Sequence, residues 1–276
     1  LIIKIIPRFD SNFYAYYLDV GQGDSAILIY PNKSKVVMLD TGGKLNYSEY
    51  EWMISSKKYN ISDNVIKFLK SKGITKINYL ILTHGDYDHI GEAINLVIKF
   101  KVEKVIFNCG SYNDLEKKLI KVLDKKNIKY YSCIKELNID DNKLNFLQTK
   151  EYDNENDNSN VIYFEYLKYK FLFMGDASSN VEDYIMSKYN LSDITFFKVG
   201  HHGSKTSSSK NFIDCITPKI SLISLGRGNI YGHPNEEVLE NLNNSKIYRT
   251  DLDGSINIKI NKSKVRVRTA IKREGE

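Results

Sequence analysis

The stretch that decides the fold is Thr83-His84-Gly85-Asp86-Tyr87-Asp88-His89-Ile90-Gly91, in which two imidazoles and two carboxylates fall within six residues. It follows the predicted strand 77–82, which is mainly apolar and has the length of a buried strand. Side chains on a loop after a strand can converge on a small volume, and imidazole and carboxylate are ligands for zinc, manganese and iron ions. Separate turn-forming roles for these residues would not explain their density, so we interpret the stretch as part of a metal site.

Other ligand-type side chains follow strand-like runs in the same way. All five histidines stand beside glycine, aspartate or another histidine, and an aspartate follows the apolar run 171–174. Because ligand sites of α/β proteins collect at the carboxyl ends of strands, we expect these side chains to share one edge of the sheets. Beyond the opening stretch, they are Asp176, His201, His202 and His233.

The rest of the chain alternates strand and helix patterns. Residues 13–39 predict three antiparallel strands separated by turn chemistry. Strand-length apolar runs then alternate with amphipathic helix patterns, and the alternation restarts after the polar segment 151–160. We therefore predict one α/β domain over 1–276, in which two half-domains, about 1–150 and 151–276, pack sheet against sheet with helices outside.

Length and composition are those of an ordinary folded domain. The chain has 276 residues, of which 42% are hydrophobic and 27% charged, and this excludes a disordered or fibrous protein. No apolar run approaches the roughly 20 residues that a transmembrane helix needs. The sequence begins at Leu1 without a signal-peptide pattern, so we expect that it was cut from a longer protein.

The net charge of +6 permits a nucleic-acid partner without requiring one. Only six of the forty basic residues are arginine, which favours compositional bias and a solvated surface. The tail 262–273 alternates basic with apolar residues. This pattern is typical of a strand with one basic face, which could contact nucleic acid or could be a charged edge strand exposed to solvent. Tyr47, Tyr50 and Trp52 are candidates for stacking on bases, although packing is the commoner role of such side chains.

The three cysteines, Cys109, Cys133 and Cys215, lie far apart and show no paired spacing typical of a zinc or redox site. We interpret them as small buried hydrophobic residues. An odd count argues against a disulfide framework but leaves one bridge open, and with it the redox compartment.

In their order and spacing, these motifs resemble the metallo-β-lactamase fold, and within it the hydrolase domain of ComEC-type competence proteins. The resemblance covers nearly the whole chain. It rests on six segments, 18–25, 39–43, 83–91, 173–176, 199–204 and 231–234. The resemblance implies a four-layer αββα sandwich with a two-metal centre at one edge.

The resemblance also implies roles for single residues. Six residues would bind the metals. His84 and Asp86 would bind the first ion, Asp88, His89 and His233 the second, and Asp176 would bridge the two. Catalytic roles fall to Asp88 and to His201 or His202, of which one faces the site without the sequence saying which, and the donor-rich loop that follows offers Ser204 and Lys205 to phosphate oxygens. Asp19 and Asp40 are either turn formers or hydrogen-bond partners of the metal-binding histidines.

Two departures from the superfamily pattern bear on the metals. Asp86 stands where the broader superfamily has a second histidine of its motif, and no histidine precedes the strand 161–167. Because oxygen ligands shift the preference from zinc toward manganese, we expect two divalent ions, with Mn²⁺ favoured over Zn²⁺. The first site is short of ligands and open to water, to substrate or to an amide oxygen. Asn158, in the segment that stands in place of the missing histidine, is a candidate for binding substrate or for supplying that oxygen.

The expected activity is metal-dependent hydrolysis of phosphodiesters, because two ions about 3.5 to 4 Å apart stabilise both the attacking and the leaving oxygen at phosphorus. The resemblance implies a nuclease that acts on DNA during uptake. It would be a monomeric domain at the extracytoplasmic face, beside a membrane-embedded remainder of the parent protein, or a cytoplasmic enzyme if free-standing. Two alternatives stay open: a phosphoesterase for a phosphorylcholine-bearing wall polymer, and a non-catalytic binding module with an incomplete metal site.

Overall fold

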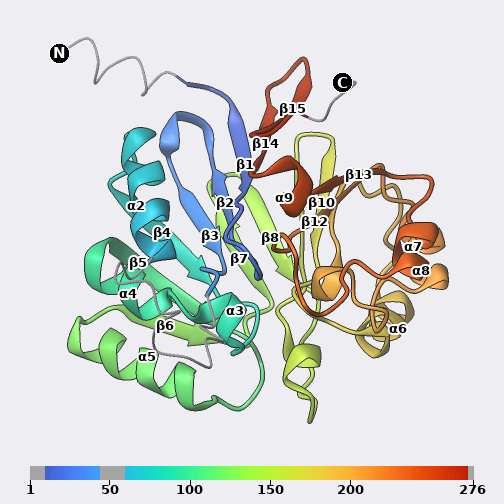
Figure 1. The fold of residues 1–276 in the computed structure, drawn as a ribbon. Coiled ribbons are helices and arrows are strands. Elements are labelled where there is room, and N and C mark those ends of the chain that lie inside the picture. Colours follow the sequence, from blue (N-terminus) through green and yellow to red (C-terminus); the bar gives the residue numbers. More distant parts are fainter. Residues whose placement is uncertain (1–9, 44–59, 273–276) are drawn as a thin grey trace.

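Two β-sheets form the centre of the molecule (Figure 1). The computed structural model describes residues 10–43 and 60–272, so Tyr47, Tyr50 and Trp52 lie outside the described residues. The strands are β1 (Phe13–Tyr17), β2 (Ala26–Ile29), β3 (Val36–Leu39), β4 (Lys76–Ile81), β5 (Lys101–Phe107), β6 (Lys129–Ser132), β7 (Glu136–Ile139), β8 (Asn142–Phe146), β9 (Ile162–Tyr166), β10 (Tyr169–Phe173), β11 (Phe196–Lys198), β12 (Ile220–Ile223), β13 (Lys246–Arg249), β14 (Ile256–Ile260) and β15 (Val265–Thr269).

Each sheet is antiparallel in one part and parallel in the other. The first has the order β15-β14-β1-β2-β3-β4-β5-β6, with antiparallel pairing as far as β3 and parallel pairing from β3 to β6. The second has the order β13-β12-β11-β10-β9-β8-β7, with parallel pairing from β13 to β10 and antiparallel pairing beyond. The antiparallel meander predicted for residues 13–39 is confirmed.

Helices cover the outer face of each sheet (Figure 1). They are α2 (Ile61–Ser71), α3 (Tyr87–Ile90), α4 (Ala93–Lys99), α5 (Asp114–Lys125), α6 (Ser179–Lys188), α7 (Lys210–Ile216), α8 (Glu236–Asn241) and α9 (Thr250–Asp253), with 3₁₀ turns η2 (Pro31–Lys33), η4 (Glu155–Asn158) and η5 (Gly200–Gly203). The apolar faces of α2, α4 and α5 pack on the first sheet, and those of α6, α7 and α8 pack on the second.

A third apolar cluster fills the space between the sheets. Aromatic side chains dominate it: the rings of Phe164 and Phe171 stack at 4.6 Å, and Phe13 meets Phe171 edge to face at 5.8 Å. Such pairs contribute about 0.5 to 1.5 kcal/mol beyond the area that they bury. One core between the sheets and one under each helical layer make the predicted four-layer αββα sandwich.

The sheets do not divide the chain at the boundary predicted near residue 150. The hairpin β7–β8, which was not predicted, belongs to the second sheet, whereas β14 and β15 return to the first sheet beside β1. The hairpin strands read ELNI and NKLNF, too short and too polar for a clear alternating pattern. The return of β14 depends on pairing with a strand more than two hundred residues away, for example Ile260 with Phe13.

The interpretation of the cysteines as buried residues is wrong. Cys109 and Cys133 form a disulfide, and Cys215 is exposed. The bridge arises because β5 and β6 are parallel neighbours, so that the residues just beyond their carboxyl ends meet, with the Cα atoms 4.2 Å apart. The two cysteines are 24 residues apart in the sequence, so their contact could not be predicted from their spacing.

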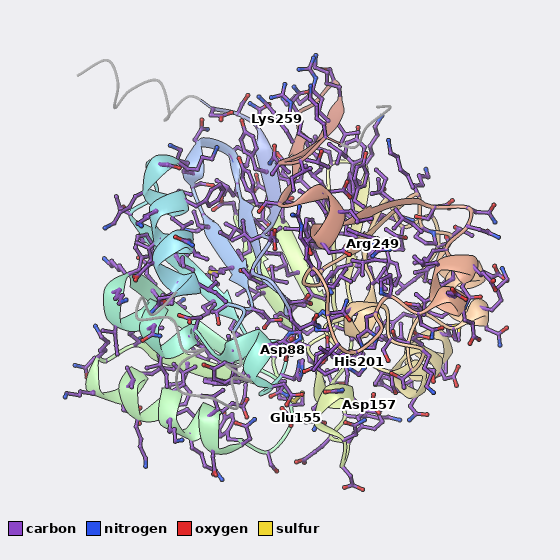
Figure 2. All side chains as sticks on the ribbon, viewed as in Figure 1. Asp88, Glu155, Asp157, His201, Arg249 and Lys259 are labelled. Atoms are coloured by element: carbon purple, nitrogen blue, oxygen red, sulfur yellow. A yellow bond between two sulfur atoms is a disulfide. The ribbon has the colours of Figure 1, made fainter. Side chains whose placement is uncertain are left out.

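The basic tail forms an edge strand. In β15, Arg266 and Arg268 are exposed, while Val265 and Val267 pack against the core between the sheets. In Figure 2 the neighbouring Lys259 of β14 lies well away from Asp88 and His201. Within residues 10–43 and 60–272, no helix has the length and hydropathy needed to span a bilayer.

Candidate metal centre

The carboxyl ends of parallel strands from both sheets meet at one edge of the sandwich. From the first sheet, Asp40 follows β3 and His84 lies just beyond β4. From the second sheet, Asp176 lies beyond β10, and His201 and His202 lie in η5, just after β11. Segments far apart in the sequence thus bring their polar side chains together where the strands end, as expected for ligand sites of α/β proteins.

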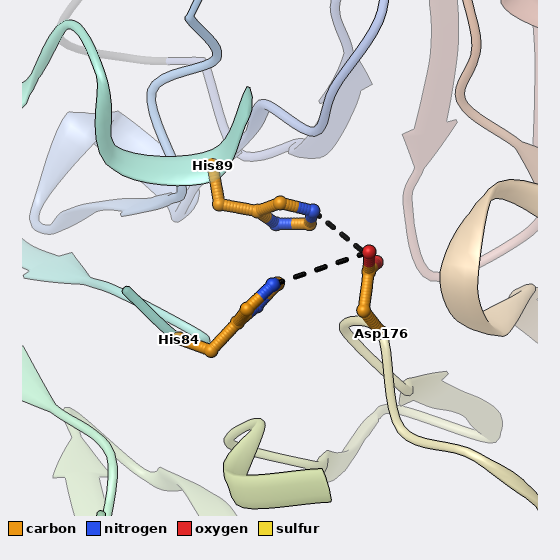
Figure 3. A group of neighbouring side chains, drawn as sticks. All are labelled: His84, His89 and Asp176. Atoms are coloured by element: carbon orange, nitrogen blue, oxygen red, sulfur yellow. Dashed lines mark ion pairs between the residues drawn. The ribbon is translucent and has the colours of Figure 1, made fainter. Parts of the chain in front are cut away.

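Asp176 is the centre of this group (Figure 3). Its carboxylate lies 3.2 Å from His89 Nε2, 4.0 Å from His84 Nε2 and 3.5 Å from His202 Nε2. All four side chains are buried. The half-exposed carboxylate of Asp86 lies 3.6 Å from His84 Nε2, on the solvent side of the group.

A second group of ligand atoms adjoins the first. Asp88, His89 and His202 each offer an atom within 4.8 Å of the others, as do His84, His89 and Asp176. The two groups share His89, and Asp88 lies 3.2 Å from His202 Nε2. Asp176 contacts imidazoles of both groups, so the two groups could hold cations side by side.

The inner histidines are oriented by bonds at Nδ1. His89 Nδ1 lies 2.8 Å from the carboxylate of Asp40, and His202 Nδ1 lies 2.7 Å from the carbonyl oxygen of Ser224. Both partners are acceptors, so we assign the proton to Nδ1 and the lone pair to Nε2. Metal-binding histidines are commonly held in this way by a carboxylate or a carbonyl. The predicted supporting role of Asp40 therefore agrees with its contacts.

Four buried atoms in this group have no hydrogen-bond partner: Nε2 of His84, His89 and His202, and Oδ1 of Asp176. Leaving a buried polar group unsatisfied costs about 1 to 3 kcal/mol, and more for a charged group. Here the unsatisfied atoms belong to side chains that converge on one volume. Bound divalent cations would give each of these atoms a partner. The donor set therefore fits the two divalent ions that the sequence implies.

The electrostatics of the group favour positive charge. Burial opposes protonation of His89, but the charges of Asp176 and Asp40 outweigh burial and raise the pKa of His89 well above its usual value. Burial likewise disfavours ionised Asp88, but the adjacent imidazoles of His202 and His89 hold the pKa of Asp88 below its usual range. A cation bound here competes with protons for the same sites.

The turn at Gly85 is held from two sides. Glu155 of η4 accepts a hydrogen bond from Gly85 N at 2.7 Å, and Asn113 Nδ2 donates to the carbonyl oxygen of Gly85 at 2.7 Å. A Cβ atom at position 85 would lie 2.1 Å from Asn113 Nδ2, so the close approach requires glycine. Asn113 also caps α5 in a capping box with Glu116, whose pKa is raised to about 7 by burial. These contacts were not predicted from the sequence, although an asparagine followed three residues later by glutamate indicates a helix cap.

The predicted ligand role of Asn158 does not agree with its contacts. Its side-chain oxygen accepts a hydrogen bond from Tyr152 N at 2.7 Å, and its amide nitrogen donates to Tyr152 O at 2.9 Å. Both ends of the amide therefore close a local loop. The neighbouring Ser159 approaches the site instead, since its hydroxyl lies 3.4 Å from His84 Nδ1 and accepts a hydrogen bond from Asp176 N at 3.0 Å.

Three other predicted residues do not line the open pocket over the candidate site. Asp19 is exposed and its carboxylate accepts a hydrogen bond from Gly21 N at 3.2 Å, which is the turn-forming role rather than the support of a histidine. Ser204 is buried, and its hydroxyl accepts hydrogen bonds from Thr206. Lys205 is exposed on the same turn. Neither Ser204 nor Lys205 is among the residues that line the open pocket over the metal centre.

That pocket has a volume of about 340 Å³. It is lined by Gln22, Asp86, Tyr87, Asp88, Asp176, His201, His202, Tyr231 and His233. Three carboxylates among these residues would repel an anionic substrate unless cations were bound.

Burial lowers the pKa of both His201 and His233, and the neighbouring imidazoles add to this effect, so these two rings favour the neutral form near pH 7.

A buried ion pair lies behind His202 and was not predicted. Lys198 Nζ is 2.7 Å from Asp24 Oδ2 and donates to the carbonyl oxygen of Val199 at 2.9 Å. The other carboxylate oxygen of Asp24 lies 3.5 Å from His202 Nδ1. The pair therefore packs against the far side of a metal-binding ring.

His202 and His233 lie at different depths in the candidate site. His202 belongs to the ligand cluster, whereas His233 lines the outer pocket, with its ring centre 5.8 Å from that of His201. Two consecutive residues with positive φ, 45° at His201 and 52° at His202, turn the second imidazole inward. No sequence pattern distinguishes the two rings in this respect.

Replacement of His202 is therefore expected to weaken metal binding more than replacement of His233. In the His202→Gln variant we expect the second Mn²⁺ equivalent to bind at least about a hundredfold more weakly, because one ligand and its support are lost. The His233→Gln variant serves as the matched control and is expected to keep both equivalents. Isothermal titration with Mn²⁺ measures both, and stronger impairment by His233→Gln would contradict the assignment.

Comparisons with known proteins agree with this architecture. Residues 18–227 match the family model described as the Metallo-beta-lactamase superfamily. Among solved structures, the metallo-beta-lactamase fold protein YhfI from Bacillus subtilis shares 9% identity at a TM-score of 0.54, covering 86% of this chain and 96% of that chain. A mutant of the beta-hydroxylase CmlA shares 11% identity at a TM-score of 0.53, covering 90% of this chain and 54% of that chain.

Curated relatives carry names from competence and recombination. The chain is 32% identical over 263 residues to ComE operon protein 3 of Bacillus subtilis, covering 92% of this chain and 34% of that protein. It is 26% identical to Recombination protein 2 of Haemophilus influenzae, covering 92% of this chain and 29% of that protein. The chain thus spans about a third of the length of these relatives. The family match over most of the chain, together with the fold and the ligand cluster, shows that the chain belongs to the metallo-beta-lactamase superfamily.

Proposed function

We propose that the chain is a metal-dependent phosphodiesterase whose substrate is DNA. The observation that carries this proposal is the convergence of four unsatisfied buried ligand atoms beneath an open pocket lined with carboxylates. A non-catalytic binding module would not need to keep such atoms unpaired at the floor of a pocket. The proposal therefore places hydrolysis, rather than binding alone, at this edge of the sandwich.

Two groups of residues would hold the divalent ions. His84, Asp86 and Asp176 surround the first position, and Asp88, His89 and His202 lie close enough together for the second. Ions bound there supply Lewis-acid stabilisation of the charge that develops at phosphorus and lower the pKa of water. The oxygen-rich set, with Asp86 in place of a histidine, favours Mn²⁺ over Zn²⁺.

The remaining pocket residues would orient the substrate and move protons. His201 is tied through Nδ1 to Thr206 Oγ1 at 3.1 Å, and its Nε2 lies on the pocket side, 3.9 Å from Asp176. We propose that this neutral imidazole acts at Nε2 as a general base that accepts a proton from the attacking water, a contribution of about a hundred- to ten-thousandfold in other enzymes. His233, at the same rim, is placed to contact a non-bridging phosphate oxygen.

The names of the relatives suggest the biological setting. One is called Competence protein ComA, and it matches 86% of this chain at 26% identity. We propose that the domain degrades one DNA strand during uptake, at the extracytoplasmic face and beside the membrane-embedded part of a longer protein. The disulfide between Cys109 and Cys133 supports this placement, because such bonds persist in oxidising compartments.

The test is a cleavage assay on purified protein with Mn²⁺. We expect cleavage of labelled single-stranded DNA and of bis(p-nitrophenyl) phosphate, loss of both activities with a chelator, and recovery on addition of Mn²⁺. Cleavage of the small diester with intact DNA would reject the nuclease role. Release of phosphorylcholine from a wall polymer by the same preparation would favour a different substrate.

A further inference from the structure

We infer that Tyr87 and Tyr231 are stacking surfaces for unpaired nucleotide bases beside the metal centre, so that they determine the preference of the site for single-stranded nucleic acid. This inference rests on the proposed function and identifies the part of the substrate that the same pocket recognises. Both side chains line the pocket that contains Asp88 and Asp176. Both are large aromatic side chains that remain partly exposed, at 37% for Tyr87 and 48% for Tyr231.

Tyr87 is held in place by two glycines. It lies in α3, between two carboxylates of the metal centre. A Cβ atom on Gly91 would lie 2.8 Å from Tyr87 Cε1, and one on Gly43 would lie 2.9 Å from Tyr87 Cδ1. The ring therefore packs closely on glycine backbone while part of it stays open to the pocket. A ring that is already ordered gives up little conformational entropy when a base stacks on it.

Tyr231 faces the same pocket from the second sheet. It lies in the segment that follows β12, and its ring is nearly parallel to that of His233, with an interplanar angle of 18° and a centroid distance of 6.0 Å. Its neighbour Ile230 is 78% exposed, so apolar surface continues beyond the rim. The two tyrosines thus come from opposite halves of the sandwich and meet the pocket from two sides.

The pocket has the size and the aromatic surface for an unpaired base. A volume of about 340 Å³ is within the range of small-molecule sites and leaves room for a phosphate with an adjoining base. Bases are uncharged, so they stack on tyrosine without repulsion from Asp86 or Asp88. Bases within a duplex are already stacked and paired, so only unpaired bases reach these rings. A quaternary ammonium group is the other ligand that two tyrosines suit, and it is included in the test.

Equilibrium binding tests the inference without relying on cleavage. The probes are a fluorescently labelled pentathymidylate with phosphorothioate linkages and an abasic pentamer of the same backbone charge, each titrated with protein and Mn²⁺ by fluorescence anisotropy. We expect the wild-type protein to bind the thymidine pentamer about a hundredfold more tightly than the abasic one, since stacking of one base on each of the two tyrosines is worth about tenfold. Tyr87→Ala and Tyr231→Ala are each expected to reduce this ratio about tenfold, and Tyr87→Phe is expected to restore it.

The controls separate this inference from the proposed function. Tyr131, 45% exposed on the edge strand β6, is a matched control, and Tyr131→Ala is expected to leave the ratio unchanged. A wild-type ratio near one, an unchanged ratio in both pocket variants, or stronger competition by phosphorylcholine than by thymidine monophosphate would overturn the inference. Base-dependent binding without cleavage of any diester would instead reject the proposed nuclease activity and leave the stacking role in place.

Discussion

Replacement of Asp176 by asparagine is expected to lower kcat/KM for bis(p-nitrophenyl) phosphate by about a thousandfold, equivalent to about 4 kcal/mol. The carboxylate of Asp176 lies within 4.0 Å of Nε2 of His84, His89 and His202, so its charge would act on a cation bound by either group. Asparagine keeps the size of the side chain but removes the charge. Steady-state kinetics at saturating Mn²⁺, with bound metal measured on the same samples, test this expectation.

The exposed Asp183 of α6 provides the matched control for this substitution. Asp183→Asn makes the same chemical change away from the metal centre and is expected to keep full activity. Circular dichroism establishes that both variants are folded. An Asp176→Asn variant that keeps its metals and more than a tenth of its activity would show that the charge of Asp176 is not needed.

Replacement of Lys198 by methionine is expected to destabilise the fold by about 3 to 5 kcal/mol, because it leaves a buried carboxylate without its partner. Lys198 is 3% exposed and Asp24 7%, and their charged atoms are 2.7 Å apart. Urea denaturation measures the loss. In the double variant, Asp24→Asn with Lys198→Met, part of the stability is expected to return because no buried charge is left unpaired.

The exposed Lys121 of α5 is the matched control for the loss of a lysine charge. Lys121→Met is expected to change the free energy of unfolding by less than about 0.5 kcal/mol, as surface substitutions usually do. If Lys198→Met were no more destabilising than Lys121→Met, the ion pair would not contribute to stability. Loss of Mn²⁺ affinity in Lys198→Met would further show that the pair helps to hold His202.

Features of the fold that depend on local patterns could be predicted from the sequence. The strand before His84 is mainly apolar and ends at the ligand loop, so both its position and its direction were evident. The carboxylate of Asp176 likewise follows an apolar strand. Because parallel strands present their carboxyl ends together, the convergence of these two loops followed from their position in the chain.

Features that depend on long-range contacts or on side-chain direction could not be predicted. The pairing of Asp24 with Lys198 joins residues from different sheets, and neither residue has a local pattern that indicates burial. The inward rotation of His202 depends on two residues in the left-handed backbone region, which histidine rarely adopts. Asn158 has the right chemistry for a ligand, but its amide is occupied by the backbone of Tyr152.

The most direct test of the metal centre is anomalous X-ray scattering from crystals grown with Mn²⁺. Two anomalous peaks are expected, one at coordination distance from His84 Nε2 and the carboxylate of Asp176, and one at coordination distance from Asp88 and His202 Nε2. The same crystals treated with a chelator are expected to lose both peaks. Crystals that contain Mn²⁺ but show no anomalous peak among these side chains would contradict the assignment of this cluster as the metal centre.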